Sequence, residues 1–136
     1  RALASEVPAY RWLGGLPHGL TRRRIRDAQV LVHPSRMEGG AQVIIEALRS
    51  GTAVIATRVP GNVGLLGDDH PGLVEPDDTA ALVALLGRCR DDPAMLPALR
   101  AAGAALPPRF APEAERRALL ALLAGLSPAA PLSSPA

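Results

Sequence analysis

The chain has 136 residues, of which 48% are hydrophobic, so it is long enough to bury one core. Its formal net charge is only +2 and it has one Trp, one Tyr and one Phe, which argues against a nucleic-acid-binding surface. It has no apolar run of the roughly 18 residues that a membrane span needs, and its single cysteine, Cys89, excludes an internal disulfide and a cysteine-based zinc site.

The first third of the chain predicts two strands with a helix between them. Tyr10–Leu13 is a short strand candidate that ends at two glycines. Thr21 is placed to cap a helix that runs through Ala28, and the arginine cluster at 22–26 is expected to form a solvated face of that helix. Gln29–His33 is a compact apolar run that stops at a proline, which predicts a buried strand of a parallel sheet.

The rest of the chain continues the alternation of helices and strands. The expected elements are a helix from about Ala41 to Ser50, a strand at Ala53–Thr57, a turn or short helix at Asn62–Leu66, a strand at Gly72–Pro76, a helix capped by Asp77, Asp78 and Thr79, and helices near 94–105 and 112–126. Cys89 falls on an apolar helix side, where a buried packing role is expected. This order predicts an α/β fold, a Rossmann-like parallel sheet with helices on both faces.

Ligands of such a sheet bind beyond the carboxyl ends of its strands. Two loops with polar or glycine-rich sequences lie there, 34–40 and 59–64. In the first, Gly39 and Gly40 stand where a helix begins, and the N–H groups and dipole of a helix start favour an anion such as a diphosphate. Glu38 precedes this start and Glu46 lies further along the helix, where carboxylates can accept hydrogen bonds from sugar and ribose hydroxyls.

Each of these acids also has a plainer interpretation. Glu46 shares a helix side with Arg49, so an exposed Glu46–Arg49 pair is physically adequate. Glu38 beside a glycine also fits an ordinary loop acid. His33, in a buried strand, is more often a satisfied core residue than a base. His18 is expected in a loop or cap, and the cluster at 68–70 is expected to be a turn rather than a metal site.

The stretch from Pro34 to Leu48 resembles the retaining glycosyltransferases of family 4 and their GT-B relatives. Their motif is two glutamates separated by seven residues after a Pro-Ser strand end, followed by a Gly-Xaa-Pro-Val-Val strand. The counterparts here are Pro34, Ser35, Glu38, Glu46 and the strand start at 51–55. The resemblance implies that the chain is part of the C-terminal, donor-binding domain of a GT-B fold, and it covers roughly residues 12–110.

The resemblance also implies roles for individual residues. Glu38 would be the catalytic residue, contacting the donor sugar, and Glu46 would hold the ribose. The residues implied in donor binding are Ser35, Gly39, Gly40, Ala41, Gln42 and Glu46, with the amides of the residues after Glu38 contacting sugar and phosphates. The chain departs from the family's usual Gly-Phe-Gly-Leu, because it has Gly-Gly-Ala-Gln at 39–42, and Ala53 stands in place of the usual proline.

Two stretches of the chain resemble a narrower group within this family. They are Pro-Ser-Arg-Met-Glu-Gly-Gly-Ala at 34–41 and Arg-Val-Pro-Gly-Asn-Val-Gly-Leu-Leu-Gly at 58–67. This group is the selenosugar synthases of selenoneine biosynthesis, which join a sugar from a UDP-sugar to selenium from selenophosphate. On that resemblance Arg36, Gly61 and Asn62 are candidates for contacting the anionic acceptor or the diphosphate, since the planar fork of arginine suits oxyanions. A surface ion pair between Arg36 and a nearby carboxylate stays an open alternative.

We therefore expect a glycosyltransferase that transfers a sugar from a UDP-sugar to an acceptor, with selenophosphate as the acceptor on the narrower resemblance. No cofactor and no metal is expected, because a helix start and basic side chains can neutralise the leaving UDP. The expected partners are the nucleotide sugar, an anionic small-molecule acceptor and an N-terminal acceptor domain of the same longer chain, without nucleic acid or a transmembrane segment. A non-catalytic nucleotide-sugar-binding module and a GT-B-fold sugar epimerase remain alternatives.

The organisation of the chain is expected to be that of a fragment. It begins without Met and without the regions of a signal peptide. Residues 1–126 are expected to form a partial domain, and residues 127–136 a disordered tail rich in Pro, Ala and Ser. We expect the fragment alone to be inactive, and its parent protein to be cytoplasmic, since nothing in the sequence demands an oxidising compartment.

Overall fold

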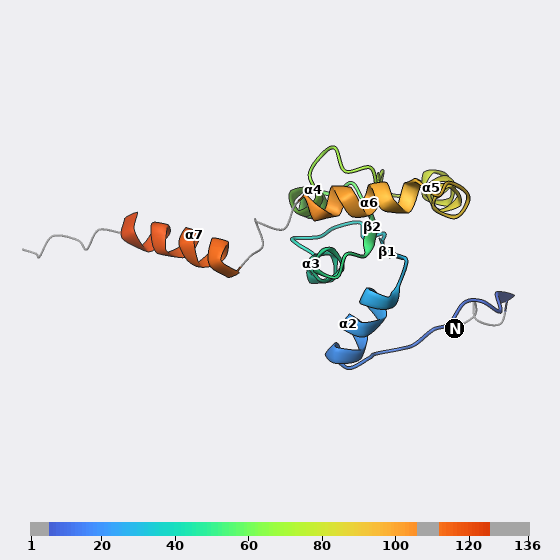
Figure 1. Cartoon of the computed structure of the whole chain (residues 1–136), viewed down its shortest axis with the longest axis horizontal. Coiled ribbons are helices and arrows are strands. Elements are labelled where there is room, and N and C mark those ends of the chain that lie inside the picture. The colour runs from blue at the N-terminus through green and yellow to red at the C-terminus, as the bar shows by residue number, and fades with distance from the viewer. Residues whose placement is uncertain (1–5, 106–111, 126–136) are drawn as a thin grey trace, which may run out of the picture.

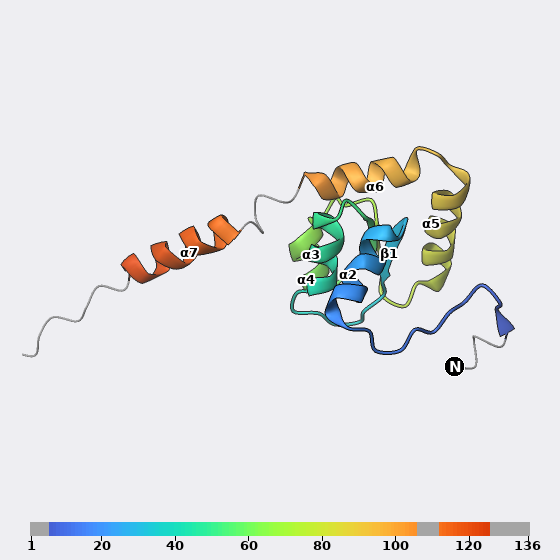
Figure 2. The same cartoon turned by 60° about the horizontal axis from the view of Figure 1, so that its bottom comes forward.

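The computed structural model describes residues 6–105 and 112–125. Its elements are α2 (His18–Asp27), β1 (Val30–His33), α3 (Gln42–Arg49), β2 (Ala53–Thr57), α4 (Pro60–Leu66), β3 (Leu73–Val74), α5 (Thr79–Asp91), α6 (Met95–Ala104) and α7 (Pro112–Gly125). Figures 1 and 2 show the strands enclosed by helices α2 to α6, with α7 lying apart from them. The tail predicted for residues 127–136 lies outside the described residues.

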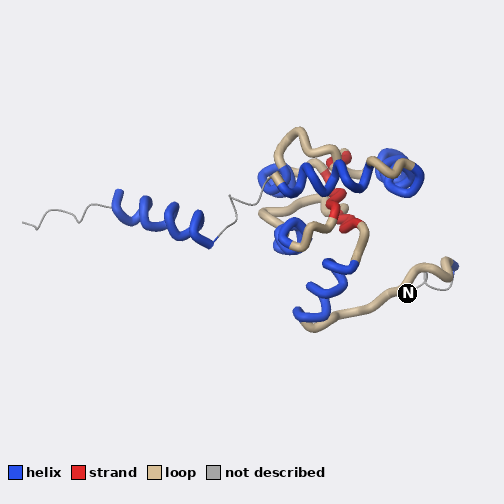
Figure 3. The backbone as a smooth tube through the Cα atoms, in the orientation of Figure 1, coloured by secondary structure: helices blue, strands red, loops and turns tan. Residues whose placement is uncertain are grey.

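The three strands form one parallel sheet in the order β1-β2-β3. The register places His33 opposite Ala56 and Thr57 opposite Val74. Helix α3 connects β1 to β2 and helix α4 connects β2 to β3, as the tube in Figure 3 shows. The carboxyl ends of the strands therefore meet at one edge of the sheet, and the loops after β1 and β2 both begin there. The predicted parallel α/β fold is confirmed.

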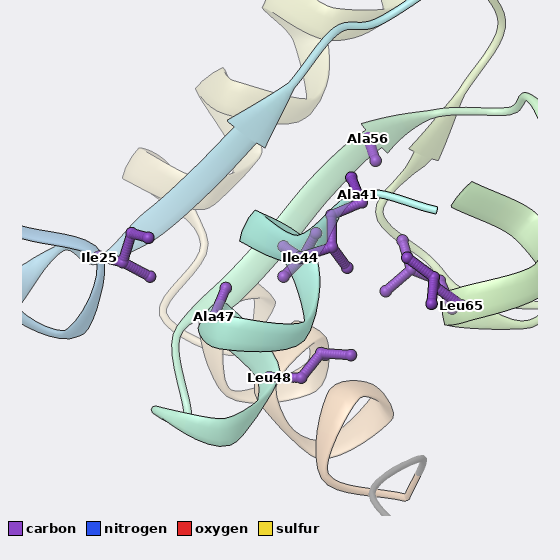
Figure 4. Close-up of a cluster of buried hydrophobic side chains, with 9 residues drawn as sticks. Ile25, Ala41, Ile44, Ala47, Leu48, Ala56 and Leu65 are labelled. Atoms are coloured by element: carbon purple, nitrogen blue, oxygen red, sulfur yellow. The ribbon is translucent and has the colours of Figure 1, made fainter. Parts of the chain in front are cut away.

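Helices cover both faces of the sheet, as predicted. All five residues of β2 are buried, and successive side chains of a strand point to opposite faces. Val54 and Ala56 pack with apolar residues of α2, α3 and α4, whereas Ala53 and Ile55 pack with residues of α5 and α6. Figure 4 shows the first of these clusters, in which Ile44 of α3 lies against β2. Strand β2 is therefore the centre of the core.

The strand predicted at Tyr10–Leu13 does not form. These residues have no regular secondary structure, and the Trp12 side chain is 63% exposed. The strand predicted at Gln29–His33 forms as β1, but it is less buried than predicted. Within the described residues it has a neighbour on one side only, and its four residues are partly buried. A strand needs a neighbouring strand and an apolar surface to pack on, and the local sequence pattern supplies neither.

Helix α2 begins at His18, three residues before the predicted N-cap. Pro17 occupies the N-cap position, and its carbonyl accepts a hydrogen bond from the Thr21 amide at 3.0 Å. Thr21 thus lies inside the helix, where its hydroxyl also donates to the Pro17 carbonyl, at 3.3 Å. Because proline has no N–H to lose and a fixed φ, the helix starts directly after it. The arginines at 22–26 are exposed on α2, as predicted.

The remaining elements keep their predicted order, with bounds shifted by a few residues. Helix α5 starts after the predicted cap, since the Asp78 carboxylate accepts a hydrogen bond from the Ala81 amide at 2.8 Å. Helix α4 begins at Pro60 rather than Asn62, and β3 is shorter than predicted.

Cys89 is half-buried and packs against the core cluster that contains Ala53 and Ile55, where burial raises the pKa of its thiol. No helix in 6–105 or 112–125 is long and apolar enough to cross a membrane.

The predicted turn at 68–70 forms and ends in a buried histidine. The His70 side chain is only 5% exposed, and its Nδ1 accepts a hydrogen bond from the Gly72 amide at 3.1 Å. Its Nε2 has no partner among the described residues. Burial lowers the pKa of His70 below its ordinary value of 6.5, because an imidazolium is poorly solvated inside the protein.

We expect His70 to make the fold sensitive to acid. The unfolded chain takes up a proton near pH 6.5 whereas the folded chain keeps His70 neutral, so the free energy of unfolding falls as the pH drops below about 6.5. Its contribution is fully present above the unfolded value and is lost as the pH approaches the lower, folded pKa. Urea unfolding at about pH 7.5 and about pH 5 measures this difference. A His70→Asn variant keeps an acceptor for the Gly72 amide and should lose less stability in acid; an unchanged difference would contradict the assignment.

Candidate functional site

Glu38 lies in the loop between β1 and α3, and two side chains hold its carboxylate. Its Oε1 lies 3.1 Å from Nε2 of His33 and accepts a hydrogen bond from the Ser35 hydroxyl at 2.9 Å. His33 is the last residue of β1, so the sheet fixes the position of its ring. Both contacts use Oε1, and Oε2 has no hydrogen-bond partner within the described residues. The carboxylate of Glu38 is 28% exposed, and its role in binding a ligand stays a prediction.

The start of α3 has the properties of an anion site. No side chain caps it, and its first turn has no acidic residue. Ala41 is the N-cap, and its carbonyl accepts a hydrogen bond from the Ile44 amide at 3.0 Å. The amides of Gln42 and Val43 have no acceptor among residues 6–105 and 112–125, as expected for the first turn of a helix. Gly40 precedes them with a φ of 145°, a conformation that residues with a side chain avoid.

Glu46 is the fifth residue of α3, about 6 Å along the helix axis from Gln42. Its Oε1 lies 2.8 Å from Nε2 of His18, the first residue of α2. The Glu46 side chain is 13% exposed and the His18 side chain is 73% exposed. The two acids therefore lie beside the same helix start, one before it and one just over a turn after it, and each has one oxygen held by an imidazole.

Arg36 forms the surface ion pair that the sequence left open as an alternative. Its guanidinium lies 2.8 Å from Oδ1 of Asp77, with the two side chains 80% and 64% exposed. An ion pair as exposed as this contributes at most about 1 kcal/mol. An anionic ligand can therefore displace Asp77 at little cost, and contact between Arg36 and a ligand stays a prediction.

The other two candidates for contacting the acceptor or the diphosphate lie behind the Glu38 loop. A β-carbon on Gly61 would lie 2.1 Å from the Glu38 carbonyl oxygen and 3.0 Å from the Gly40 nitrogen, so only glycine fits this approach of two backbones. The Asn62 side chain is fully buried, and its Nδ2 donates to the Thr57 carbonyl at 2.9 Å. Its burial does not favour the predicted ligand contact of Asn62, which stays a prediction. Gly61 has a packing role, and its ligand contact stays a prediction.

The structure thus gathers most of the predicted residues at one edge of the sheet. The loop after β1 and the start of α3 contain Ser35, Glu38, Gly39, Gly40, Ala41, Gln42 and Glu46. Ala41 is 6% exposed, so only its backbone can meet a ligand. Sequence reasoning missed His33 as a partner of Glu38, although its place at the carboxyl end of a strand was a usable signal. It also missed His18, whose contact with Glu46 spans 28 positions of the chain.

Comparison with known proteins identifies a family of similar sequences. The sequence model of the family described as glycosyl transferases group 1 matches residues 3–104. The chain is 37% identical over 71 residues to the MMP alpha-(1->4)-mannosyltransferase of Mycolicibacterium hassiacum, an alignment that covers 51% of this chain and 17% of that protein. It is 40% identical over 80 residues to the D-inositol 3-phosphate glycosyltransferase of Streptomyces coelicolor, with 58% of this chain and 18% of that protein covered. The chain therefore spans less than a fifth of these two curated relatives.

A solved structure with a similar fold is the sucrose-phosphate synthase of Thermosynechococcus elongatus. The superposition has a TM-score of 0.70 at 29% sequence identity. It covers 93% of this chain and 34% of that chain. The parallel sheet with its helices is thus similar to one part of a larger protein.

Proposed function

The chain belongs to the group 1 glycosyltransferases, and on that basis we propose that it is the donor-binding part of a GT-B glycosyltransferase. The start of α3 binds the diphosphate of a nucleotide sugar, Glu38 binds the sugar, and Glu46 holds the ribose. The names of the similar proteins describe a mannosyltransferase, an inositol-phosphate glycosyltransferase and a sucrose-phosphate synthase. The observation that carries the proposal is an uncapped helix start that lies between two carboxylates, each of which has one oxygen held by an imidazole.

The proposed reaction breaks the bond between the anomeric carbon of the sugar and the diphosphate oxygen, and it forms a bond between that carbon and a nucleophilic atom of the acceptor. The nucleoside diphosphate leaves with the bonding electrons, and positive charge develops at the anomeric carbon. The unpaired amides at the start of α3 and the helix dipole stabilise the charge on the leaving diphosphate. Glu38 is held by His33 and Ser35, so its carboxylate is already oriented before the donor binds.

We further propose UDP as the leaving group and selenophosphate as the acceptor, in a cytoplasmic reaction. Support comes from the similarity of residues 34–41 and 58–67 to selenosugar synthases. Arg36 adds a physical argument, because its guanidinium is 80% exposed and is paired only with the exposed Asp77 carboxylate among the described residues. A guanidinium in that setting suits an oxyanion such as selenophosphate.

The test of this function uses a protein that contains this chain together with an acceptor-binding domain. It is incubated with selenophosphate and either UDP-glucose or UDP-N-acetylglucosamine, and the products are identified by mass spectrometry. We expect UDP release and a sugar that contains selenium, whereas the 136-residue chain alone should release no UDP. A glycoside without selenium would overturn the acceptor and keep the transferase. A UDP-sugar that is bound but not consumed would instead favour a non-catalytic binding module.

A further inference from the structure

A series of hydrogen bonds runs from the interior of the protein to Glu38. The side-chain nitrogen of Asn62, Nδ2, donates to the Thr57 carbonyl at 2.9 Å and to the Thr57 hydroxyl at 3.3 Å. The Thr57 hydroxyl donates to the backbone carbonyl of Ser35. The side-chain hydroxyl of Ser35 in turn donates to Oε1 of Glu38 at 2.9 Å, the shorter of its two contacts, the other being the Met37 carbonyl at 3.2 Å. The series connects the start of α4, the end of β2 and the loop after β1.

The donors and acceptors fix the direction of this series. Because the two N–H groups of Asn62 both point at oxygens of Thr57, the Thr57 hydroxyl keeps its proton for the Ser35 carbonyl. Thr57 is 4% exposed and Asn62 is 0% exposed, so bulk water does not compete for these bonds. The bond from Asn62 to the Thr57 hydroxyl and the bond from that hydroxyl to the Ser35 carbonyl share one oxygen, so each polarises and strengthens the other. The effect on Glu38 then passes through the position of the Ser35 backbone.

Two features indicate that Asn62 is kept for this contact and not for packing alone. Its Oδ1 is buried without a hydrogen-bond partner in the described part of the chain. Such an atom destabilises a fold, and an apolar side chain at this position would avoid that cost. In addition, its neighbour Gly61 lies against the Glu38 carbonyl, so the first turn of α4 supports the Glu38 loop by packing as well as by hydrogen bonds.

We propose that Thr57 and Asn62 are positioning residues that hold Glu38 in the orientation in which it binds the donor sugar. This inference rests on the proposed function, in which Glu38 contacts the sugar and Glu46 contacts the ribose. A residue that positions Glu38 therefore changes only the part of the affinity that comes from contacts with the sugar. We measure that part as the dissociation constant of UDP divided by the dissociation constant of the UDP-sugar.

The experiment compares two variants at Thr57 by calorimetric titration of the chain with UDP and with UDP-glucose or UDP-N-acetylglucosamine, whichever binds more tightly. Thr57→Val keeps the volume and removes the hydroxyl, whereas Thr57→Ser keeps the hydroxyl. We expect Thr57→Val to lower the ratio of the two dissociation constants by about 3- to 10-fold with the UDP value unchanged, the range for one weakened hydrogen bond to a carboxylate. Thr57→Ser should retain the ratio.

Equal loss of affinity for UDP and for the UDP-sugar would overturn the inference, since that is the result of a merely structural role. Equal behaviour of Thr57→Val and Thr57→Ser would also overturn it. If Thr57→Val does not fold, as judged by thermal melting, Thr57→Ala removes the same hydroxyl without placing a methyl group against the Ser35 carbonyl, and it is expected to change the ratio in the same way. Absence of UDP binding by the unchanged chain would overturn the donor site itself.

Discussion

The Glu46→Ala variant is expected to bind UDP about 10- to 100-fold more weakly than the unchanged chain. In the proposed site this carboxylate accepts hydrogen bonds from both ribose hydroxyls, and charge-assisted bonds of this kind contribute about 1.5–3 kcal/mol each before the competing pair with an imidazole is subtracted. Stability should change by no more than about 1 kcal/mol, because the His18 partner is 73% exposed. Calorimetry gives the affinity and urea unfolding gives the stability.

Asp27→Ala provides the matched control for this prediction. Asp27 has the same charge and forms an exposed ion pair with Arg26 at 3.0 Å, at the far end of α2 from His18. Its removal should leave UDP affinity within about twofold. Equal UDP affinity in the Glu46→Ala variant and the unchanged chain would show that Glu46 does not hold the ribose. A similar loss in both variants would mean that net charge, rather than a specific contact, governs binding.

The Gly61→Ala variant is expected to lose about 1–3 kcal/mol of stability, the usual range for overpacking. The new β-carbon would lie 2.1 Å from the Glu38 carbonyl oxygen, and backbone atoms cannot move aside as a flexible side chain can. Because the Glu38 loop must shift to admit it, the sugar's share of the donor affinity should fall as well. Urea unfolding and titration with UDP and a UDP-sugar measure the two effects.

Gly64→Ala tests the same chemical change on the same helix. A β-carbon at Gly64 meets nothing within 4 Å, and the residue is exposed on α4. Alanine is a better helix former than glycine by up to about 1 kcal/mol, so this variant should be neutral or more stable. If the two variants had the same stability, the close packing of Gly61 on the Glu38 loop would not exist in solution.

The predicted elements differ in accuracy for physical reasons. Strand β2 has the predicted bounds, Ala53–Thr57, because a continuous apolar run between a glycine turn and a proline suits a strand that is buried on both faces. The strand predicted at Tyr10–Leu13 failed because strand formation depends on a neighbour in the sheet. The start of α2 was misplaced because Thr21 has the chemistry of a cap, yet Pro17 fixes the chain direction first.

The site shows the same division between local and long-range information. The sequence could predict that Glu38, the two glycines and Glu46 lie near one another, because they belong to one short stretch of the chain. The contact of His18 with Glu46 spans 28 positions and that of Thr57 with Ser35 spans 22, and no local pattern reveals such contacts. Asn62 was placed at the correct edge of the sheet, but its burial depends on the packing of α4 against β2.

Nuclear magnetic resonance of the isotope-labelled chain during titration with UDP tests the central claim most directly. If the diphosphate binds at the start of α3, the largest amide chemical-shift changes will fall at residues 39–43, with smaller changes around Glu46 and His18. UDP that saturates the protein while those amides stay unchanged, or that shifts mainly the amides of α5 and α6, would contradict the proposed site.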